Sequence, residues 1–344
     1  MKKKLFLILF IGAALIFAGC GGEKQETLNV FNWGEYIDED LISKFEEETG
    51  IKVNYETFST NEDMYVKVKS GGSSYDVLIP SDYMIEKMAK EDLLQELDYS
   101  KIPNITNISP MFQDLIFDPD NKYSVPYFWG TVGILYNTEQ VDDVVDSWDI
   151  LWNEKYANKI LMMDSQRDSL AVALKKLGYS MNTRNETELE EAKQELIEQK
   201  PLVLAYIVDE IRDKMLSGEG AVAVAWSGDA MDVILSGENF NYVVPKEGSN
   251  FWVDAMVIPA NAKNPDAAHK FINFMTDPEN AAANSEYIGY STPNEAALEL
   301  LPDEMINSNV AYPSQEVIDN CEIFRDPGEF ISVYNRIWTE VTIY

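Results

Sequence analysis

The first part of the chain alternates between apolar strands and amphipathic helices. Residues 27–33 (TLNVFNW) form a nearly continuous apolar run, which is typical of a parallel strand covered on both faces. A stripe of apolar residues at helical spacing follows, formed by Ile37, Leu41, Ile42 and Phe45. Gly50 marks the end of this helix, and residues 51–57 alternate as a second strand should. A helix over 61–69 and a buried strand over 75–80 complete a strand–helix–strand series.

The same pattern returns in the second half of the chain. Strands are predicted over 159–164, 221–226, 241–245 and 251–258. Between them, helices are predicted up to Gly178, over 186–199 and from Asp229 onward. Alternating strands and helices of these lengths predict a doubly wound α/β sheet. Because the sequence shows no long Pro- or Gly-rich linker, two closely joined α/β lobes are expected.

Aromatic and acidic residues follow one predicted strand after another. The residues concerned are Trp33, Glu35, Tyr36, Ser81, Tyr83, Ser165, Asp168, Trp226 and Asp229. In the last predicted strand, Trp252 and Asp254 are two positions apart and therefore point to the same face. Ligands of open α/β sheets bind beyond the carboxyl ends of the strands, so we expect these side chains to collect at one site. Structural roles stay open for Asp229 as a helix cap, Asp168 as a charge in a first helical turn and Trp33 as a core residue.

A site lined with aromatic rings and carboxylates selects a ligand that is both apolar and positively charged. Burying about seven methylenes against flat rings contributes on the order of 5 kcal/mol. Each ammonium group adds roughly 0.5–2 kcal/mol by cation–π attraction, and each charge-assisted hydrogen bond to a carboxylate adds about 1.5–3 kcal/mol. A polyamine, which is a flexible alkyl chain with several ammonium groups, meets these requirements.

The first twenty residues have the features of an export signal. Three lysines, Lys2, Lys3 and Lys4, precede an apolar run that is too short for a membrane span. The run ends in Ala18-Gly19-Cys20, which resembles the lipobox of bacterial lipoproteins, although Phe17 stands where that motif usually has Leu. We expect a lipoprotein signal peptide over 1–20, lipidation at Cys20 and a tether over 21–26. The alternative is an ordinary signal cut near Ala18.

Acidic residues greatly outnumber basic ones. Three of the 27 basic residues belong to the leader, so 24 face 59 acidic ones, a net charge near −35. Such a surface repels nucleic acid and attracts small cations. With Cys20 lipidated, Cys321 has no partner for an internal disulfide, and we expect it to be a small buried residue. The single histidine, His269, lies in a helix predicted from Asn264 as N-cap and Pro265 as first residue, and we expect it at the surface.

Several longer segments carry a family resemblance. They are FNWGEYI, YDVLIPSDYMIEKM, YSVPYFWGTVGILYN, LKKLGYS, VPKEGSNFWVDAMVIPANAKN and IGYSTPN. In this order, over nearly all of residues 27–344, the chain resembles the spermidine/putrescine-binding proteins of bacterial ABC importers. The resemblance implies a two-lobe, type II periplasmic-binding-protein fold with two crossover strands and a ligand cleft between the lobes. Lobe 1 would comprise 27–132 and 253–298, and lobe 2 would comprise 133–252 and 299–344.

The resemblance also implies roles for the residues at the strand ends. Aromatic walls are expected from Trp33, Tyr36, Tyr83, Trp226, Trp252 and Tyr290. Polar contacts are expected from Glu35 and Ser81. Asp254 is expected to bind an amine, Asp168 falls where spermidine binders have a glutamate, and Asp229 matches an acid of putrescine-type relatives. Ser165 stands where the spermidine branch has a second aspartate, and Phe324 where it has a glutamine. We therefore expect both amines to bind, with Asp229 partly replacing the missing acid.

The implied function is capture of a polyamine by a membrane-anchored, extracytoplasmic lipoprotein. Closure of the lobes around the ligand would precede delivery to the permease subunits of an ABC importer. No cofactor, metal ion or catalytic residue is expected, and the protein is expected to be a monomer. The alternatives are a secreted carboxylate-based hydrolase such as a glycosidase, a binder of a sugar, an amino acid or ferric iron on the same fold, and a sensor that reports polyamine occupancy to a membrane receptor.

Overall fold

The computed structural model describes residues 25–72 and 74–344, which form a mixed α/β protein around one long, curled sheet. The predicted signal peptide and Cys20 lie outside these residues. Within them the sheet has nine strands, in the order β2-β1-β3-β9-β4-β7-β5-β6, with β8 paired to β4. The strands are β1 (Thr27–Trp33), β2 (Lys52–Phe58), β3 (Val77–Leu78), β4 (Ser124–Asn137), β5 (Ile160–Met163), β6 (Val203–Ile207), β7 (Val222–Trp226), β8 (Phe240–Val243) and β9 (Phe251–Val257).

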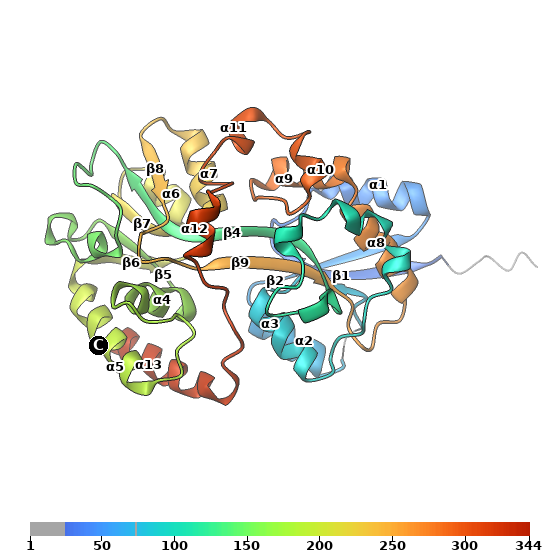
Figure 1. Ribbon diagram of the computed structural model, residues 1–344, viewed down its shortest axis with the longest axis horizontal. Helices are drawn as coiled ribbons and strands as arrows, with labels where there is room; N and C mark the ends of the chain where they lie inside the picture. Colours follow the sequence, from blue (N-terminus) through green and yellow to red (C-terminus); the bar gives the residue numbers. More distant parts are fainter. Residues whose placement is uncertain (1–24, 73) are drawn as a thin grey trace, which may run out of the picture.

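The two ends of the sheet repeat one arrangement. At one end β1 lies between β2 and β3 and is parallel to both, and at the other end β5 lies between β6 and β7 and is parallel to both. The antiparallel pair of β4 and β9 connects the two ends. The first part of β4 pairs with β9, and its last part pairs with β7 and β8. One strand therefore belongs to both lobes, and Figure 1 shows β4 and β9 running side by side across the middle of the molecule.

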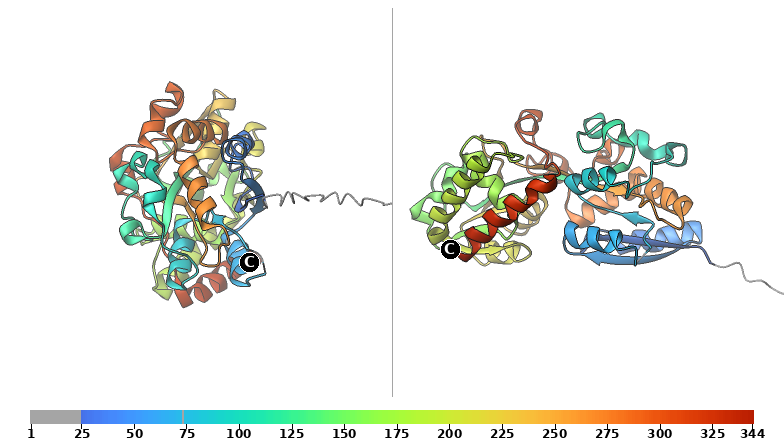
Figure 2. Two further views of the ribbon diagram at one scale, coloured as in Figure 1. Left: turned by 90° about the vertical axis from the view of Figure 1, so that its right-hand side faces the viewer. Right: turned by 90° about the horizontal axis from the view of Figure 1, so that it is seen from below.

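Helices pack on both ends of the sheet. They are α1 (Glu39–Thr49), α2 (Asn61–Lys69), α3 (Asp82–Lys90), α4 (Gln166–Lys176), α5 (Glu186–Gln199), α6 (Ile211–Leu216), α7 (Ser227–Ser236), α8 (Pro265–Met275), α9 (Pro278–Ile288), α10 (Glu295–Leu298), α11 (Asp303–Ile306), α12 (Gln315–Asp319) and α13 (Ile331–Ile343). Short 3-10 helices occur at η1 (Tyr99–Lys101), η2 (Pro103–Asn107), η3 (Pro110–Phe112), η4 (Pro119–Asn121), η5 (Trp148–Trp152), η6 (Glu154–Tyr156), η7 (Lys200–Leu202) and η8 (Gly328–Phe330). Figure 2 shows two bodies, with α13 in one and α8 in the other.

Local sequence explains where the helices begin and end. Asp38 caps α1, because its side chain accepts a hydrogen bond from the backbone N–H of Asp40. At the other end Gly50 adopts a left-handed conformation (φ 72°) and donates its N–H to the carbonyl of Glu46. In the second lobe, Ser165 caps α4 by accepting from the N–H of Asp168. Both of these helices follow a strand directly or after a short turn, so their N-termini lie near the carboxyl ends of β1 and β5.

The structure confirms most of the predicted elements and corrects some. The strand expected over 75–80 forms ladder pairs only at Val77–Leu78, and the helix expected from Asp229 begins two residues earlier, at Ser227. Hydrophobic pattern alone predicted neither β4 nor β6. The two-lobe fold is confirmed, whereas the exact boundaries between the lobes stay a prediction.

The prediction for His269 was wrong. Its side chain is 3% exposed, because α8 packs the ring against the segment around Asp98. Nε2 accepts a hydrogen bond from the N–H of Asp98 (2.9 Å), so Nδ1 carries the proton and donates to the carbonyl of Pro265 (2.6 Å). Cys321 is half-buried rather than fully buried, and its thiol lies 3.2 Å from the carbonyl oxygen of Val317.

Candidate functional site

A buried carboxylate, Asp254, lies at the centre of the candidate site. It stands opposite Phe128 in the β4–β9 ladder and forms an isolated bridge pair with Ser81, which directly precedes α3. The hydroxyl of Tyr36 donates a hydrogen bond to Oδ2 of Asp254 at 2.7 Å. Burial raises the pKa of Asp254 to about 6, although hydrogen bonds from Ser81 and Tyr36 oppose the rise. Asp254 is therefore a carboxylate held in an apolar environment with only neutral donors bonded to it.

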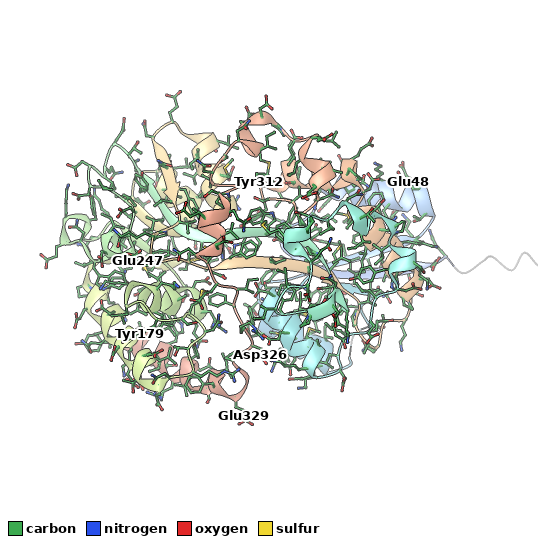
Figure 3. The ribbon with its side chains drawn as sticks, in the orientation of Figure 1. Glu48, Tyr179, Glu247, Tyr312, Asp326 and Glu329 are labelled. Carbon is green, nitrogen blue, oxygen red and sulfur yellow. The ribbon has the colours of Figure 1, made fainter. Side chains whose placement is uncertain are left out.

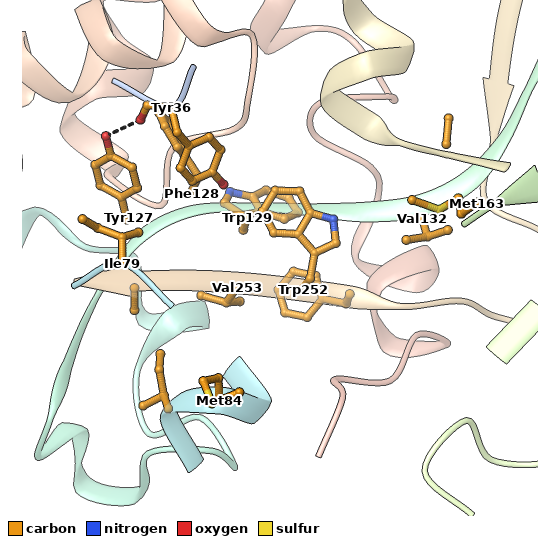
Figure 4. Close-up of a cluster of buried hydrophobic side chains, with 14 of the residues drawn as sticks. Tyr36, Ile79, Met84, Tyr127, Phe128, Trp129, Val132, Met163, Trp252 and Val253 are labelled. Carbon is orange, nitrogen blue, oxygen red and sulfur yellow. Dashed lines mark hydrogen bonds between the residues drawn. The ribbon is translucent and has the colours of Figure 1, made fainter. Parts of the chain in front are cut away.

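Aromatic rings surround this carboxylate. We call Tyr36, Phe128, Trp252 and Tyr290 the aromatic cluster. Tyr36 meets Tyr290 edge to face with centroids 5.7 Å apart, and Trp252 meets Tyr290 in the same way at 5.3 Å. Figure 4 shows the Trp252 indole rising from β9 on the side where Tyr36 and Phe128 lie, with Met84 on the other side of the strand. Trp252 thus contacts Tyr290 and Asp254 bonds Tyr36, and these two tyrosines contact each other, which agrees with the predicted alternation along the strand.

Two glycines make room for the aromatic cluster. Gly130 lies opposite Trp252 in the ladder, and a Cβ at this position would come within 2.6 Å of Cζ2 of the indole. A Cβ on Gly228, in the first turn of α7, would overlap the ring of Tyr290. Because real Cβ contacts are not this short, an alanine at either position would displace a ring of the cluster. The backbone of β4 and α7 is therefore part of the wall of the site.

Ser81 and Tyr83, at the start of α3, are fixed by Asn61. The amide of Asn61 donates to Oγ of Ser81 (3.1 Å) and to the hydroxyl of Tyr83 (3.0 Å). Tyr83 in turn donates to Oε1 of Glu62 at 3.1 Å. The Tyr83 ring packs against a small cluster that includes Phe324, the residue that stands where the resemblance implies a glutamine. Phe324 is therefore part of an apolar cluster, and the guanidinium of Arg167 lies 4.3 Å from the centre of its ring.

A second buried carboxylate, Asp168, lies at the N-terminus of α4 beside the hydroxyl of Ser165. Oγ of Ser165 donates to Oδ2 of Asp168 at 2.5 Å, and the Asp168 side chain is buried. Oδ1 of Asp168 is buried without a hydrogen-bond partner, and so is Oδ1 of Asn250. Both residues line one small cavity, which has room for about one water molecule. Burial raises the pKa of Asp168, and the hydrogen bond from Ser165 and the charge of Arg167 oppose this.

Trp226 and Asp229 lie where β7 passes into α7. Trp226 is half-buried at the position before the helix, and Asp229 is 7% exposed in its first turn. Asp229 does not act as the N-cap of the helix. Instead, it accepts a charge-assisted hydrogen bond from Nε of Arg212 at 2.8 Å. A cation of the chain itself therefore already occupies the acid that was expected to meet a ligand amine.

The two residues predicted after β1 lie at its carboxyl end. Trp33 is half-buried and packs on Phe58 of β2, with ring centroids 4.6 Å apart. Its Nε1 is buried without a hydrogen-bond partner. Glu35 is exposed and has a left-handed backbone conformation with φ 50°. The described contacts thus relate Trp33 to the β1–β2 side of lobe 1, and Glu35 to the surface.

An ion pair joins α3 to the segment that leads into α13. Glu86 accepts hydrogen bonds from Nε (2.9 Å) and Nη2 (2.6 Å) of Arg325 and from the N–H of Asp326 (2.8 Å). We call this contact the Glu86–Arg325 clasp, and Figure 3 shows Asp326 beside α3. Although burial acts to raise the pKa of Glu86, hydrogen bonds from Arg325, Asp326 and Lys90 lower it to about 2.

The sequence pattern missed several residues that shape the site. Phe128 lies in the apolar run of β4, and nothing in that run distinguishes it from a core residue. Asn61 and Arg212 carried no signal, because a polar residue on a helix is usually solvated. Among residues 25–72 and 74–344, no group of three or more His, Cys, Asp or Glu side chains is arranged to hold a metal ion.

Fold and site together define a class of protein. Two α/β lobes that share crossing strands, with carboxylates and aromatic rings gathered at the strand ends, are typical of a type II solute-binding protein. The chain belongs to the bacterial extracellular solute-binding proteins, whose family model matches residues 40–314.

Relatives across the whole chain support this assignment. The chain is 40% identical to the spermidine/putrescine-binding periplasmic protein of Escherichia coli, over 99% of both chains. The solved structure of PotD, the substrate-binding protein of a spermidine/putrescine ABC transporter from Streptococcus pneumoniae, is 46% identical, with a TM-score of 0.84 over 93% of this chain and 99% of that one. A Listeria monocytogenes structure with a provisional assignment to spermidine/putrescine ABC transport is 48% identical, with a TM-score of 0.88 and the same coverage.

Proposed function

We propose that the protein captures polyamines, both spermidine and putrescine, outside the cytoplasmic membrane and delivers them to the permease of an ABC importer. The observation that carries the proposal is the position of Asp254 inside the aromatic cluster, bonded to Tyr36. An ammonium group supplies the positive partner that this buried carboxylate lacks. The rings of Trp252 and Tyr290 cover the alkyl chain of the ligand. The names of the relatives agree with this ligand class.

Two further parts of the proposal concern the ends of the transport cycle. Asp254 lies on β9, in the part assigned to lobe 1, whereas Asp168 lies on α4 in lobe 2, so one ligand that contacts both would favour closure of the lobes. The lipobox at Cys20 supports anchoring to the outer face of the membrane, with residues 21–26 as a tether. Among the helices of the described residues, none is both long and apolar enough to cross a bilayer.

We propose that the protein binds its ligand without chemical change. The carboxylates of the site are bonded to hydroxyls or to a guanidinium, and they serve as acceptors for a cationic ligand. We also propose that the protein acts as a monomer, since all the candidate site residues belong to one chain.

Native mass spectrometry and calorimetry test the proposal. The mature protein should form one-to-one complexes with spermidine and with putrescine, and a neutral sugar and an amino acid of similar size should not bind. A glycoside panel tested in parallel should show no turnover. Failure of the wild-type protein to bind either amine, after removal of any ligand that co-purifies, would overturn the proposed function.

A further inference from the structure

Asp229 differs from the other acids of the site in its partner. Asp254 is bonded to the hydroxyls of Tyr36 and Ser81, and Asp168 to the hydroxyl of Ser165, which are all neutral donors. Asp229 instead receives Nε of Arg212 at 2.8 Å. Arginine stays protonated throughout the physiological range, so this carboxylate has a permanent internal counter-ion.

Arg212 is well placed to remain on Asp229. It belongs to α6, which packs against α7, and its side chain is 43% exposed while that of Asp229 is 10% exposed. A second bond joins Nη1 to Oδ2 of Asp232, one turn further along α7, at 3.1 Å. Two carboxylates thus hold opposite sides of one guanidinium, and this fork restricts its motion more than a single exposed pair would.

Asp229 is nevertheless adjacent to the aromatic cluster. It follows Gly228, whose Cα lies against the ring of Tyr290. Burial raises the pKa of Tyr290, the charges of Asp229 and Asp254 add to the rise, and the charge of Arg212 opposes it, so all three charged groups lie near the same ring. An ammonium group beside Tyr290 would therefore be close to Asp229 and also to the guanidinium of Arg212, which repels it.

From this arrangement we infer that Arg212 is a specificity-determining residue: it withdraws Asp229 from the acids available to a ligand and so favours diamines over triamines. The inference rests on the proposed function. Asp168 and Asp254 can each take one ammonium of either ligand. A triamine must place a third ammonium, and the third acid of the site is already neutralised. Arg167, next to Asp168 in the sequence, acts on that carboxylate through its charge, but its hydrogen bonds go to the carbonyl of Arg325 and the side-chain oxygen of Asn182.

Calorimetry on Arg212→Met tests the inference. Met keeps the length and apolar stem of the side chain without its charge. We expect the variant to gain affinity for spermidine relative to putrescine, with a change in the ratio of the two Kd values of about tenfold, equivalent to 1.4 kcal/mol. Arg212→Lys, which keeps the charge, should retain the wild-type ratio. In Arg212→Met combined with Asp229→Asn, the gain should disappear, because the acid that was released is gone.

Arg336→Met is the matched control for net charge. Arg336 lies on α13, is 40% exposed and also bridges acids, here Glu186, Glu190 and Glu340. It should leave the ratio unchanged, since Arg336 pairs with acids of α5 and α13 and makes no ion pair with Asp229. If Arg212→Met fails to fold, Arg212→Gln removes the charge and keeps an N–H for Asp229.

The outcomes separate the two hypotheses. Wild-type protein that binds neither amine contradicts the proposed function itself. Wild-type protein that binds amines, with an unchanged ratio in the charge-removing variant, contradicts only the role of Arg212. A change of equal size in Arg336→Met would likewise overturn the inference, because net charge alone would then explain it.

Discussion

Replacing Asp254 by asparagine should have opposite effects on stability and on binding. Burial raises the pKa of Asp254 from 3.8 to about 6. Between pH 3.8 and about 6, the folded protein therefore keeps a proton on Asp254 that the unfolded chain has released. The free energy of unfolding is therefore highest, as far as Asp254 is concerned, below pH 3.8, where the group is protonated in both states. This contribution is lost as the pH rises through about 6. The difference of 2.2 pKa units corresponds to about 3 kcal/mol of destabilisation near neutral pH. Asparagine removes this cost but weakens one hydrogen bond, at about 1 kcal/mol.

The ligand-free Asp254→Asn protein should accordingly be more stable than the wild type by about 2 kcal/mol at pH of about 7.5, and less stable by about 0.5 kcal/mol at pH of about 4. Urea unfolding at several pH values measures this crossover. The same variant should lose at least about 2 kcal/mol of affinity for spermidine and putrescine in calorimetry, because an ammonium would have no carboxylate partner.

Asp118→Asn provides a control for this experiment. Asp118 is also a buried carboxylate whose pKa burial raises, but it binds Ser124 and neighbouring backbone N–H groups away from the aromatic cluster. Its replacement should change stability and leave amine affinity as in the wild type. The reasoning would be refuted if Asp254→Asn bound both amines normally, or if it were less stable than the wild type at neutral pH.

Three further substitutions test other parts of the site. Trp252→Ala should weaken binding of all polyamines by a similar factor in calorimetry, because it removes ring contact rather than one acid; a loss limited to the longer amine would contradict this. Gly228→Ala should displace the ring of Tyr290 and lower affinity for both amines, whereas wild-type affinity would show that this ring does not contact the ligand. Glu86→Gln should lower the free energy of unfolding by about 3 kcal/mol at neutral pH, since Arg325 holds the pKa of Glu86 near 2 rather than 4.5. This difference from the wild type should shrink in urea unfolding as the pH falls through 4.5 toward about 2, and a difference that does not depend on pH would contradict it.

The strands and helices with strong local patterns could be predicted from the sequence. β1 and α1 show why: an uninterrupted apolar run, a helical stripe and a glycine that ends the helix are signals within a few residues of one another. The hydrophobic pattern did not predict β4, because its fourteen residues belong to both lobes and are buried along almost their whole length. They therefore show no alternation of apolar and polar positions. The short β3 was overestimated, because burial of 75–80 comes from packing and only two of its residues enter the ladder.

The site could be predicted in its residue types but not in its pairings. The alternation of Trp252 and Asp254 is a local property of a strand, and the structure agrees with it. The bond between Tyr36 and Asp254 joins residues 218 positions apart, so no local pattern reports it. His269 shows the same limit, because its burial also depends on a distant segment. A histidine on an amphipathic helix is expected to be solvated, but the segment around Asp98 covers this one.

Unpaired polar atoms explain why this site should respond to its ligand as a unit. Oδ1 of Asp168 and Nε1 of Trp252 are buried without hydrogen-bond partners, and Asp254 is ionised near neutral pH in an apolar environment. Each of these groups destabilises the ligand-free protein, because a buried polar group without a partner costs about 1–3 kcal/mol. Under the proposed function, two ammonium groups of one polyamine would donate to the two carboxylates, and the indole would remain an apolar surface. Binding of this kind would remove part of the cost of the buried polar groups, and it would do so fully only if residues of both lobes contact the same molecule. The binding free energy of a monoamine should then be much less than half that of a diamine. A monoamine pairs with one acid and leaves the acid of the other lobe without a partner.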